Sequence, residues 1–259
     1  MKQVQIEKTT WVGKSLLVFD MIPSTNAKAD EIAEEYPHGT VVIAGQQSAG
    51  KGRRGRVWES EKDVGIYMSI LLKPNVSPKA ATGFTLVTAL AVAKAIERVA
   101  DIKPGIKWPN DIVLNGKKIC GILTEMKLTN TNIAHVVVGI GVNVESEHFP
   151  KEIQDMASSL FMETGKKISK DKLIEEILSC FEQYYEQYLK TEDFRFLQKS
   201  YEAYLVNKDK QVRVLDPVQE YEGIARGITT TGELIVDTGQ NIRTVYAGEV
   251  SVRGIYGYV

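Results

Sequence analysis

The chain contains 259 residues, of which 43% are hydrophobic and 25% are charged, and its formal net charge at pH 7 is -1. This length and composition are typical of a globular protein with one large domain, or with one large and one small domain. The net charge argues against a general affinity for nucleic acid, and the N-terminal residues lack the apolar core of a signal peptide.

Other compositional features narrow the expected chemistry. The longest apolar stretch, Phe84 to Ala95, contains polar residues, and we interpret it as too short and too polar to span a membrane. Cys120 and Cys180 lie in apolar segments and are typical of reduced core residues, which predicts a cytoplasmic protein. The three histidines share no metal-ligand spacing, and no signature of a covalent nucleophile appears. We therefore expect chemistry that works by positioning and electrostatics.

The first predicted strand, Leu16 to Phe19, is followed by Ser24-Thr25-Asn26 and then by a helical stretch from Ala27 to Tyr36. The three polar residues have two interpretations. They can cap the helix N-terminus, or their hydroxyl and amide groups can face a ligand there. Only one residue is needed for the cap, so both interpretations can hold.

The most informative stretch is a basic, glycine-rich loop, Gly45 to Trp58, which follows a predicted strand at Thr40 to Ala44. Its glycines allow tight turns and close approach to a ligand, and its cations can neutralise phosphate or carboxylate. We interpret it as a candidate anion-binding loop; the alternative is a solvated basic loop. The residues concerned are Gly50, Gly52, Gly55, Lys51, Arg53, Arg54 and Arg56.

Two phosphate-binding motifs nearly match this loop, and both fail. A P-loop requires Ser or Thr at its eighth position, where this chain has Gly52. The dinucleotide fingerprint requires a helix directly after the glycines and an acidic residue roughly 20 residues later. No helical periodicity follows Val57, and the later window is Ile70-Leu71-Leu72-Lys73, which has no acidic residue.

Next come a predicted strand, Gly65 to Leu72, and a long apolar helix from Pro78 to about Ala100. The segment Lys107 to Glu125 then contains Asn110 and Asp111 at a strand start, where their oxygens could hold magnesium or ribose hydroxyls. Asn115-Gly116 predicts a hairpin turn between two short strands. Lys118 follows this turn, and from the residues alone a solvent-facing lysine is the favoured interpretation.

A further strand, Ala134 to Val144, carries Gly139, Gly141 and Asn143, and its glycines indicate that another group packs closely against the backbone. Helices are predicted at Lys170 to Leu189 and at about Asp193 to Leu205. From about Lys208, short alternating runs are separated by turn residues, including Asp216-Pro217. This pattern predicts a domain at residues 1–207 and a small all-β domain, typical of a barrel, at residues 208–259.

Taken together, these motifs resemble the biotin–protein ligase family, also called biotin–acetyl-CoA-carboxylase ligase, over about Leu16 to the C-terminus. Their order and spacing resemble those of the family. The motifs are Ser24-Thr25-Asn26, Gln47 with Gly50 to Trp58, Lys107-Trp108-Pro109-Asn110-Asp111, Lys118 with Gly121-Ile122-Leu123, and Gly139-Ile140-Gly141-Val142-Asn143.

The resemblance implies an α+β fold: a mixed sheet with helices on one side, like the class II synthetase-like catalytic domain of these ligases, followed by an SH3-like barrel. It also implies two reactions at one site. Biotin and ATP, with Mg²⁺, give biotinyl-5′-adenylate and pyrophosphate. A lysine of a biotin carboxyl carrier protein then takes the biotinyl group, and AMP is released. Such chemistry needs a cationic, water-poor site.

The resemblance also assigns residue roles. Arg53 and Lys118 are the expected catalytic residues. Asn110 and Asp111 are the magnesium candidates. The residues expected to bind biotin are Ser24, Thr25, Asn26, Gln47, Gly50, Lys51, Gly52, Arg53, Lys118, Gly121 and Gly139. Those expected to bind ATP are Arg53, Arg56, Trp58, Lys107, Asn110, Lys118 and Asn143.

One position departs from the family pattern, and two properties of the family bear on partners. Lys51 stands where the family usually has arginine, so the two-pronged hydrogen bonding of a guanidinium is lost there. Some members carry an N-terminal DNA-binding domain, for which the residues before the first strand are too few, so we expect the ligase-only form without DNA binding. Such ligases often dimerise through a sheet edge, and we expect a possible homodimer.

Two alternatives stay open at this point. Lipoate ligases and acyltransferases share the architecture, although the Gly50 to Trp58 loop and the C-terminal β domain favour biotin. A nucleic-acid-binding module that uses the basic loop is the second alternative, and it predicts binding that weakens steeply with salt.

Overall fold

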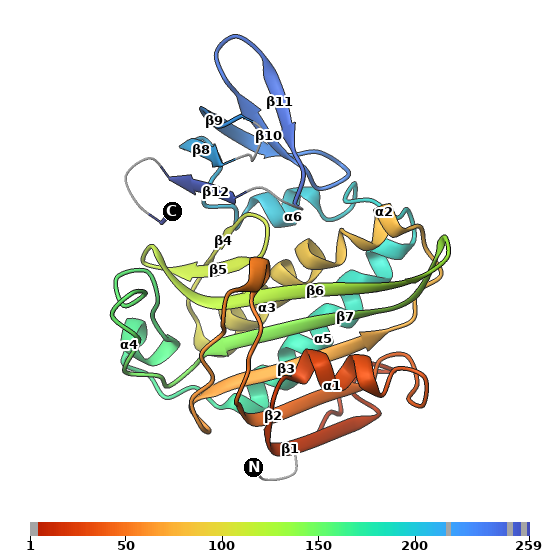
Figure 1. The fold of residues 1–259 in the computed structure, drawn as a ribbon. Coiled ribbons are helices and arrows are strands. Elements are labelled where there is room, and N and C mark those ends of the chain that lie inside the picture. Colours follow the sequence, from red (N-terminus) through yellow and green to blue (C-terminus); the bar gives the residue numbers. More distant parts are fainter. Residues whose placement is uncertain (1–4, 216–218, 248–250, 255–257) are drawn as a thin grey trace.

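The computed structural model describes residues 5–215, 219–247, 251–254 and 258–259, and these form two β-sheets with helices packed on the larger one (Figure 1). The large sheet has the strand order β1-β2-β3-β7-β6-β5-β4, and only its β1–β2 pair is parallel. Its strands are β1 (Leu16–Ile22), β2 (Val41–Gln47), β3 (Gly65–Leu72), β4 (Gly105–Lys107), β5 (Asp111–Leu114), β6 (Lys117–Thr129) and β7 (Asn132–Asn143).

Two long helices cover one face of this sheet, the arrangement that the family resemblance implied. α3 (Phe84–Ala100) and α5 (Lys170–Leu189) share one hydrophobic core with the strands (Figure 1). The opposite face is not bare, because α1 (Thr25–Glu31) packs there through Ala29 against Val42 and Val137. Helices therefore lie on both faces, and α1 leaves the neighbouring part of its face open for a site.

The predicted helix at Pro78 to Ala100 is divided into α2 (Pro78–Ala81) and α3. The break occurs at Gly83, where an added Cβ would lie 2.4 Å from the hydroxyl of Tyr188. That hydroxyl donates a 2.8 Å hydrogen bond to the carbonyl of Ala80. The Tyr188 side chain of α5 thus occupies the space beside Gly83 and bonds the carbonyl at the end of α2.

By length and composition the whole segment Pro78–Ala100, which is longer than the apolar stretch Phe84 to Ala95 considered above, meets the requirement for a membrane span. It is 23 residues long with a mean hydropathy of 1.3, but 78% of the apolar window is buried inside the protein. Such burial is typical of the core helix of a folded domain.

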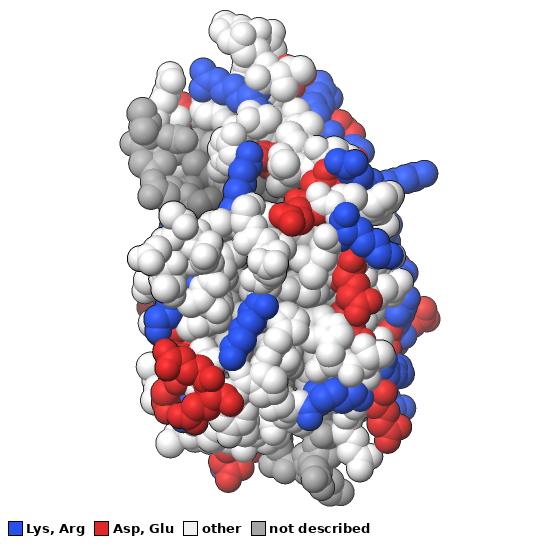
Figure 2. All heavy atoms as spheres, turned by 90° about the vertical axis from the view of Figure 1, so that its right-hand side faces the viewer, with Lys and Arg blue, Asp and Glu red and all other residues white. Residues whose placement is uncertain are grey.

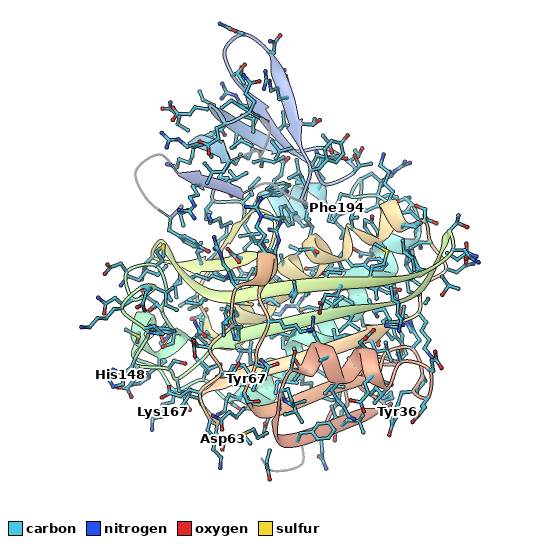
Figure 3. The ribbon with its side chains drawn as sticks, viewed as in Figure 1. Tyr36, Asp63, Tyr67, His148, Lys167 and Phe194 are labelled. Atoms are coloured by element: carbon cyan, nitrogen blue, oxygen red, sulfur yellow. The ribbon has the colours of Figure 1, made fainter. Side chains whose placement is uncertain are left out.

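The predicted helix at Asp193 to Leu205 is much shorter in the structure, where α6 spans Gln198–Glu202. Its first part is diverted by two contacts. The Asp193 carboxylate accepts a hydrogen bond from the backbone of Arg195, and the backbone N–H of Phe194 donates to Thr230 of the C-terminal sheet at 2.6 Å. Phe194 therefore lies at the junction between the helices and the C-terminal sheet (Figure 3). The remaining short helix is α4 (Leu160–Thr164).

The C-terminal strands form an antiparallel sheet in the order β11-β10-β9-β8-β12, which confirms the predicted all-β region. Within the described residues β11 does not pair with β12, so barrel closure is not seen there, and the predicted turn at Asp216-Pro217 lies outside those residues. Trp108 ties the two sheets together, because its indole N–H donates to Gly232 at 3.0 Å. The strands are β8 (Gln211–Leu215), β9 (Tyr221–Ile228), β10 (Leu234–Asp237), β11 (Ile242–Val245) and β12 (Ser251–Gly254).

Candidate active site

Two adjoining cavities lie on the face of the large sheet that carries α1, under the Gly45–Trp58 loop. The polar cavity is lined mainly by Ser24, Thr25, Asn26, Gln47 and the strand residues Gly121, Gly139 and Gly141. The cationic cavity has a volume of about 210 Å³ and extends toward the C-terminal sheet. Its charged lining residues are Arg53, Arg54, Arg56, Lys107, Lys118, Arg253, Glu59 and Asp111.

A connected hydrogen-bond network builds the polar cavity. Thr25 donates from its backbone and its hydroxyl to Oε1 of Gln47, at 2.8 and 3.1 Å. Gln47 donates through Nε2 to Ser60 at 2.9 Å. The buried hydroxyl of Ser69 lies 2.8 Å from the Thr25 hydroxyl and 2.6 Å from Oδ1 of Asn26. The network fixes the orientation of neutral donors and acceptors, which suits an uncharged polar ligand.

The N-terminus of α1 serves as both cap and cavity wall. The Ser24 hydroxyl accepts a 3.4 Å hydrogen bond from the backbone of Ala27, so it caps the helix, and Ser24 also lines the polar cavity. Asn26 donates through Nδ2 to the Glu125 carboxylate at 2.6 Å. Both interpretations of the Ser24-Thr25-Asn26 motif are therefore consistent with the structure.

The strand glycines make room for these side chains, as the sequence indicated. A Cβ on Gly139 would lie 2.1 Å from Oδ1 of Asn26. Gly121 and Gly141 are paired across β6 and β7, and a Cβ on either would lie within 2.8 Å of the Trp58 ring. Such distances leave no space for any larger residue unless a side chain moves.

The basic loop is a small hairpin rather than an extended strap. Gly52 donates to Arg56 at 2.7 Å and Trp58 donates to Gly50 at 2.9 Å, both through backbone groups. Arg54 has φ 58° at the tip. After the loop, the hydroxyl of Tyr67 on β3 donates to the carbonyl of Glu61 at 2.9 Å, so the return segment is fastened to the sheet (Figure 3).

Arg53 points inward from this loop and reaches two distant segments. It donates to Oδ1 of Asn110 at 2.8 Å and to the carbonyl of Ala247 at 2.6 Å, and burial lowers the pKa of its guanidinium. Arg54 and Arg56 are exposed. Arg53 is thus the loop cation that is built into the site.

Lys118 also points into the site, which overturns the solvent-facing interpretation of this residue. Its ammonium lies 2.6 Å from Oδ1 of Asp111 and 5.4 Å from the Trp58 ring centroid. Burial opposes ionisation of Asp111, but the charges of Lys118 and Lys107 hold its pKa below the usual value. The carboxylate therefore stays ionised and holds the ammonium in place.

Lys107 lies deeper, with 5% of its surface exposed. Burial lowers the pKa of its ammonium to about 8, against the attraction of Asp111. The ammonium lies 3.8 Å from the ring centroid of Tyr258. The Lys107 ammonium is therefore weakly solvated, and its attraction to a bound phosphate is stronger than it would be in water.

The predicted magnesium ligands do not fit a protein-held ion. Oδ1 of Asn110 accepts from Arg53, and its Nδ2 donates to Ile122 at 3.0 Å. The two oxygens of Asp111 face Lys118 and the hydroxyl of Tyr258. Within the described residues no cluster of three or more His, Cys, Asp or Glu side chains could hold a metal. An ion would have to displace a cation or the tyrosine.

The structure brings nearly all of the predicted site residues together. Gly52, Arg53, Trp58, Asn110 and Lys118 line both cavities. The other predicted residues line one of them, except Gly50, where a Cβ would lie 2.3 Å from the carbonyl of Trp58 and which therefore shapes the loop. Those on the polar cavity are Ser24, Thr25, Asn26, Gln47, Lys51, Gly121 and Gly139, and those on the cationic cavity are Arg56, Lys107, Asp111 and Asn143.

Two features of the site differ from what the sequence analysis predicted. Lys51 lines the polar cavity and not the cationic one, so the missing arginine fork lies away from the candidate phosphate-binding side. Sequence reasoning missed Ser69, Glu125 and Tyr258. Ser69 lies in a predicted strand and could have been found as a polar residue in an otherwise apolar run; the other two carry no local signal.

Comparison with known families agrees with this arrangement. Residues 18–143 match the Biotin/lipoate A/B protein ligase family, and residues 209–253 match the Biotin protein ligase C terminal domain. The bifunctional ligase/repressor BirA of Bacillus subtilis is 38% identical over 248 residues, covering 95% of this chain and 76% of that protein. The biotin–[acetyl-CoA-carboxylase] ligase of Paracoccus denitrificans is 30% identical over 236 residues, covering 89% of this chain and 98% of that protein.

A solved structure shows the same fold at similar identity. The biotin protein ligase from Aquifex aeolicus in complex with biotin and ATP superposes with a TM-score of 0.81 at 28% identity, covering 93% of this chain and 99% of that one. The two family matches, the similarity to known ligases and the shared fold all point to the same family. The two joined cavities are consistent with it. This chain is a member of the biotin protein ligase family.

Proposed function

We propose that this protein activates biotin with ATP and transfers it to a lysine of a biotin carboxyl carrier protein. The observation that carries the proposal is that Arg53 and Lys118 line both cavities. A neutral polar cavity and a cationic cavity thus meet at two cations. This is the arrangement needed to join a carboxylate on one ligand to a phosphate on another.

The polar cavity suits the ring end of biotin. A cyclic urea has two N–H donors and one carbonyl acceptor, and Thr25, Asn26 and Gln47 offer groups of both kinds. The dithiolane ring of lipoate has no such groups, so the polar atoms of this cavity would lose hydration without gaining partners. The network therefore favours biotin over lipoate as the substrate.

The cationic cavity suits the triphosphate of ATP. Arg56 and Lys107 provide charge away from the shared boundary, and Trp58 and Asn143 line the same cavity beside them. Asn143 is fixed by a 3.0 Å hydrogen bond from its Nδ2 to the carbonyl of Ser158. We assign no step to a magnesium ion, because Asn110 and Asp111 already face cationic or hydroxyl partners.

In the first step a carboxylate oxygen of biotin forms a bond to the α-phosphorus of ATP, and the bond to pyrophosphate breaks. Two anions approach each other in this step. Lys118 and Arg53 lie at the boundary where negative charge gathers, and both are held by other residues before the ligands arrive. Fixed cations at such a point lower the barrier without reorganisation.

In the second step the ε-amine of the carrier lysine forms an amide bond to the activated carbonyl, and the bond to AMP breaks. The amine loses a proton in the process. Until then the loop hairpin and Arg53 retain the adenylate, because Arg53 is bonded both to Asn110 and to the carbonyl of Ala247 in the C-terminal part of the chain.

The nucleic-acid alternative finds no support on the face of the molecule that Figure 2 shows. On the face shown in Figure 2, basic and acidic side chains are interspersed and form no continuous basic patch. The three arginines of the basic loop, Arg53, Arg54 and Arg56, instead line the cavity that contains Asp111. A gel shift at low salt that showed tight DNA binding by this chain would reverse this view.

The remaining assignments extend the proposal. We place the domain boundary near Asn207, whose side chain accepts a 2.8 Å hydrogen bond from Trp108. We propose dimerisation through the edge strand β1, which exposes 41% of Val18 and 61% of Met21. We place the protein in the cytoplasm because both cysteines are free and buried.

The test is biotinylation of an isolated carrier domain from a biotin-dependent carboxylase. With biotin and Mg-ATP we expect a mass increase of one biotinyl group on a single lysine, and no product with lipoate or without ATP. A carrier domain modified by lipoate but not by biotin would overturn the assignment. Competition between the two acids at equal concentration sharpens the same result.

A further inference from the structure

Tyr258, the next-to-last residue, lies in the cationic cavity although it is 147 positions from Asp111 in the sequence. Its hydroxyl donates a hydrogen bond to Oδ2 of Asp111, and its ring lies under the ammonium of Lys107. The chain end is folded back on β12, because a Cβ on Gly254 would lie 2.1 Å from the carbonyl oxygen of Val259. Tyr258 does not line the polar cavity.

These contacts connect Tyr258 to Lys118 through Asp111. The carboxylate of Asp111 holds Lys118 through Oδ1 and Tyr258 through Oδ2. If the hydroxyl is removed, a buried carboxylate oxygen loses its donor and the side chain is free to turn. The position of the Lys118 ammonium then loosens, although Tyr258 does not touch it.

The ring has a separate effect on Lys107. An ammonium against an aromatic face is attracted to the ring and is shielded from water on that side. The charged groups that face Lys107 are Asp111, which attracts it, and Lys118, Arg253 and Arg56, which repel it. The ring therefore keeps this cation poorly hydrated until an anion reaches it.

We propose that Tyr258 is a positioning residue of the adenylation site, with its hydroxyl orienting Asp111 and Lys118 and its ring shielding Lys107. The proposal rests on the function assigned above to Lys107 and Lys118. It predicts that the C-terminal residues act on the nucleotide half of the reaction, so that their loss changes ATP–pyrophosphate exchange far more than biotin affinity.

The test compares Tyr258→Phe with Tyr258→Ala in biotin-dependent ATP–pyrophosphate exchange. The matched control is Tyr246→Phe, because Tyr246 lies in the same C-terminal region with 64% of its surface exposed. Tyr258→Phe removes the hydroxyl alone, and we expect the exchange kcat to fall about tenfold, the usual size for a lost hydrogen bond to a charged group. Its KM for ATP and its alkaline pH limb should stay near those of the unmodified protein.

Tyr258→Ala also removes the ring, so Lys107 becomes hydrated and its pKa rises from about 8 toward its ordinary value. We expect its KM for ATP to rise and the alkaline limb of exchange to move to higher pH, a shift that Tyr258→Phe does not cause. Biotin affinity by calorimetry should change much less than exchange in every variant, because Tyr258 reaches the polar cavity only through Lys118. Thermal unfolding then separates these effects from a general loss of folding, which would lower biotin affinity as well.

Exchange by both Tyr258 variants at the rate of Tyr246→Phe would overturn the positioning role. A lower KM for ATP in Tyr258→Ala would also overturn it, because the ring would then be an obstacle to the nucleotide. Absence of biotin-dependent exchange in the unmodified protein would instead overturn the proposed function, and the role of Tyr258 with it.

Discussion

The two cavities of the site are built in opposite ways. Away from the boundary cations and Lys51, the polar cavity is made from neutral side chains on α1, β2 and the strand glycines, and a hydrogen-bond network that includes Ser69 of β3 holds them. The cationic cavity is made from charged side chains on a loop, a hairpin and the end of the chain. The first lies within the large sheet and α1, whereas the second also takes residues from the C-terminal end of the chain, including Arg253 and Tyr258.

The difference shows how one site can treat two substrates separately. Neutral donors and acceptors select a ligand by its shape and hydrogen bonds, with little dependence on pH or salt. Cations of low hydration select charge and strengthen as negative charge develops. Substitutions in the first cavity should therefore change biotin affinity, and substitutions in the second should change ATP affinity, rate and pH dependence.

Lys118→Ala should give the largest effect, because Lys118 belongs to both cavities. We expect biotin-dependent ATP–pyrophosphate exchange to fall by about 10²- to 10³-fold, the usual loss when a fixed transition-state donor is removed. Lys117→Ala is the control, because Lys117 is the adjacent residue of β6 and lines neither cavity. Near-normal exchange by Lys118→Ala would remove Lys118 from the reaction.

Gly139→Ala should damage the polar cavity alone. The new Cβ would lie 2.1 Å from Oδ1 of Asn26, so we expect biotin affinity to fall roughly 10- to 100-fold by calorimetry. Val138→Ala is the control, because Val138 is buried in the core shared with α3 and α5. Its truncation should lower stability only. Equal damage to ATP affinity in Gly139→Ala would show that the cavities are not separable.

Arg53→Gly should leave adenylate formation partly intact and let the adenylate escape. We expect biotinyl-adenylate to appear free in solution about tenfold faster, because the contacts to Asn110 and Ala247 are lost. Arg54→Gly is a matched control, because Arg54 is exposed and its φ of 58° is easily adopted by glycine. Unchanged release by Arg53→Gly would refute the retention role.

The pH dependence gives the smallest and most specific contrast. Lys107 binds phosphate only when protonated, and burial lowers its pKa to about 8. Exchange should therefore fall as the pH rises through about 8, roughly tenfold per unit above it, while biotin affinity stays level. Lys107→Arg keeps its charge and should move the alkaline limit upward. An alkaline limit that is the same in both proteins would assign it to another group.

The same contrast explains what could be predicted from sequence. The polar cavity was predicted from local signals: Ser24-Thr25-Asn26 at a helix start, and the close approach expected at Gly139. α5 has the predicted bounds, and the turn at Asn115-Gly116 has the two positive φ values expected of a hairpin, 49° and 80°.

The cationic cavity depended more on the family resemblance, because its partners carry no local sequence signal. No periodicity links Arg53 to Ala247 or Tyr258 to Asp111, and periodicity alone favoured a solvent-facing Lys118. The shortened helix at α6 has the same cause, since Phe194 donates its backbone N–H to the C-terminal sheet.

The central claim is that Arg53 and Lys118 join a biotin cavity to an ATP cavity. Its most direct test is ATP–pyrophosphate exchange by the unmodified protein with biotin, without biotin, and with lipoate in its place. We predict exchange when biotin is present, and none without biotin or with lipoate in its place. This result would establish the adenylating half-reaction. Exchange with lipoate and not biotin, or no exchange with either acid, would contradict the claim.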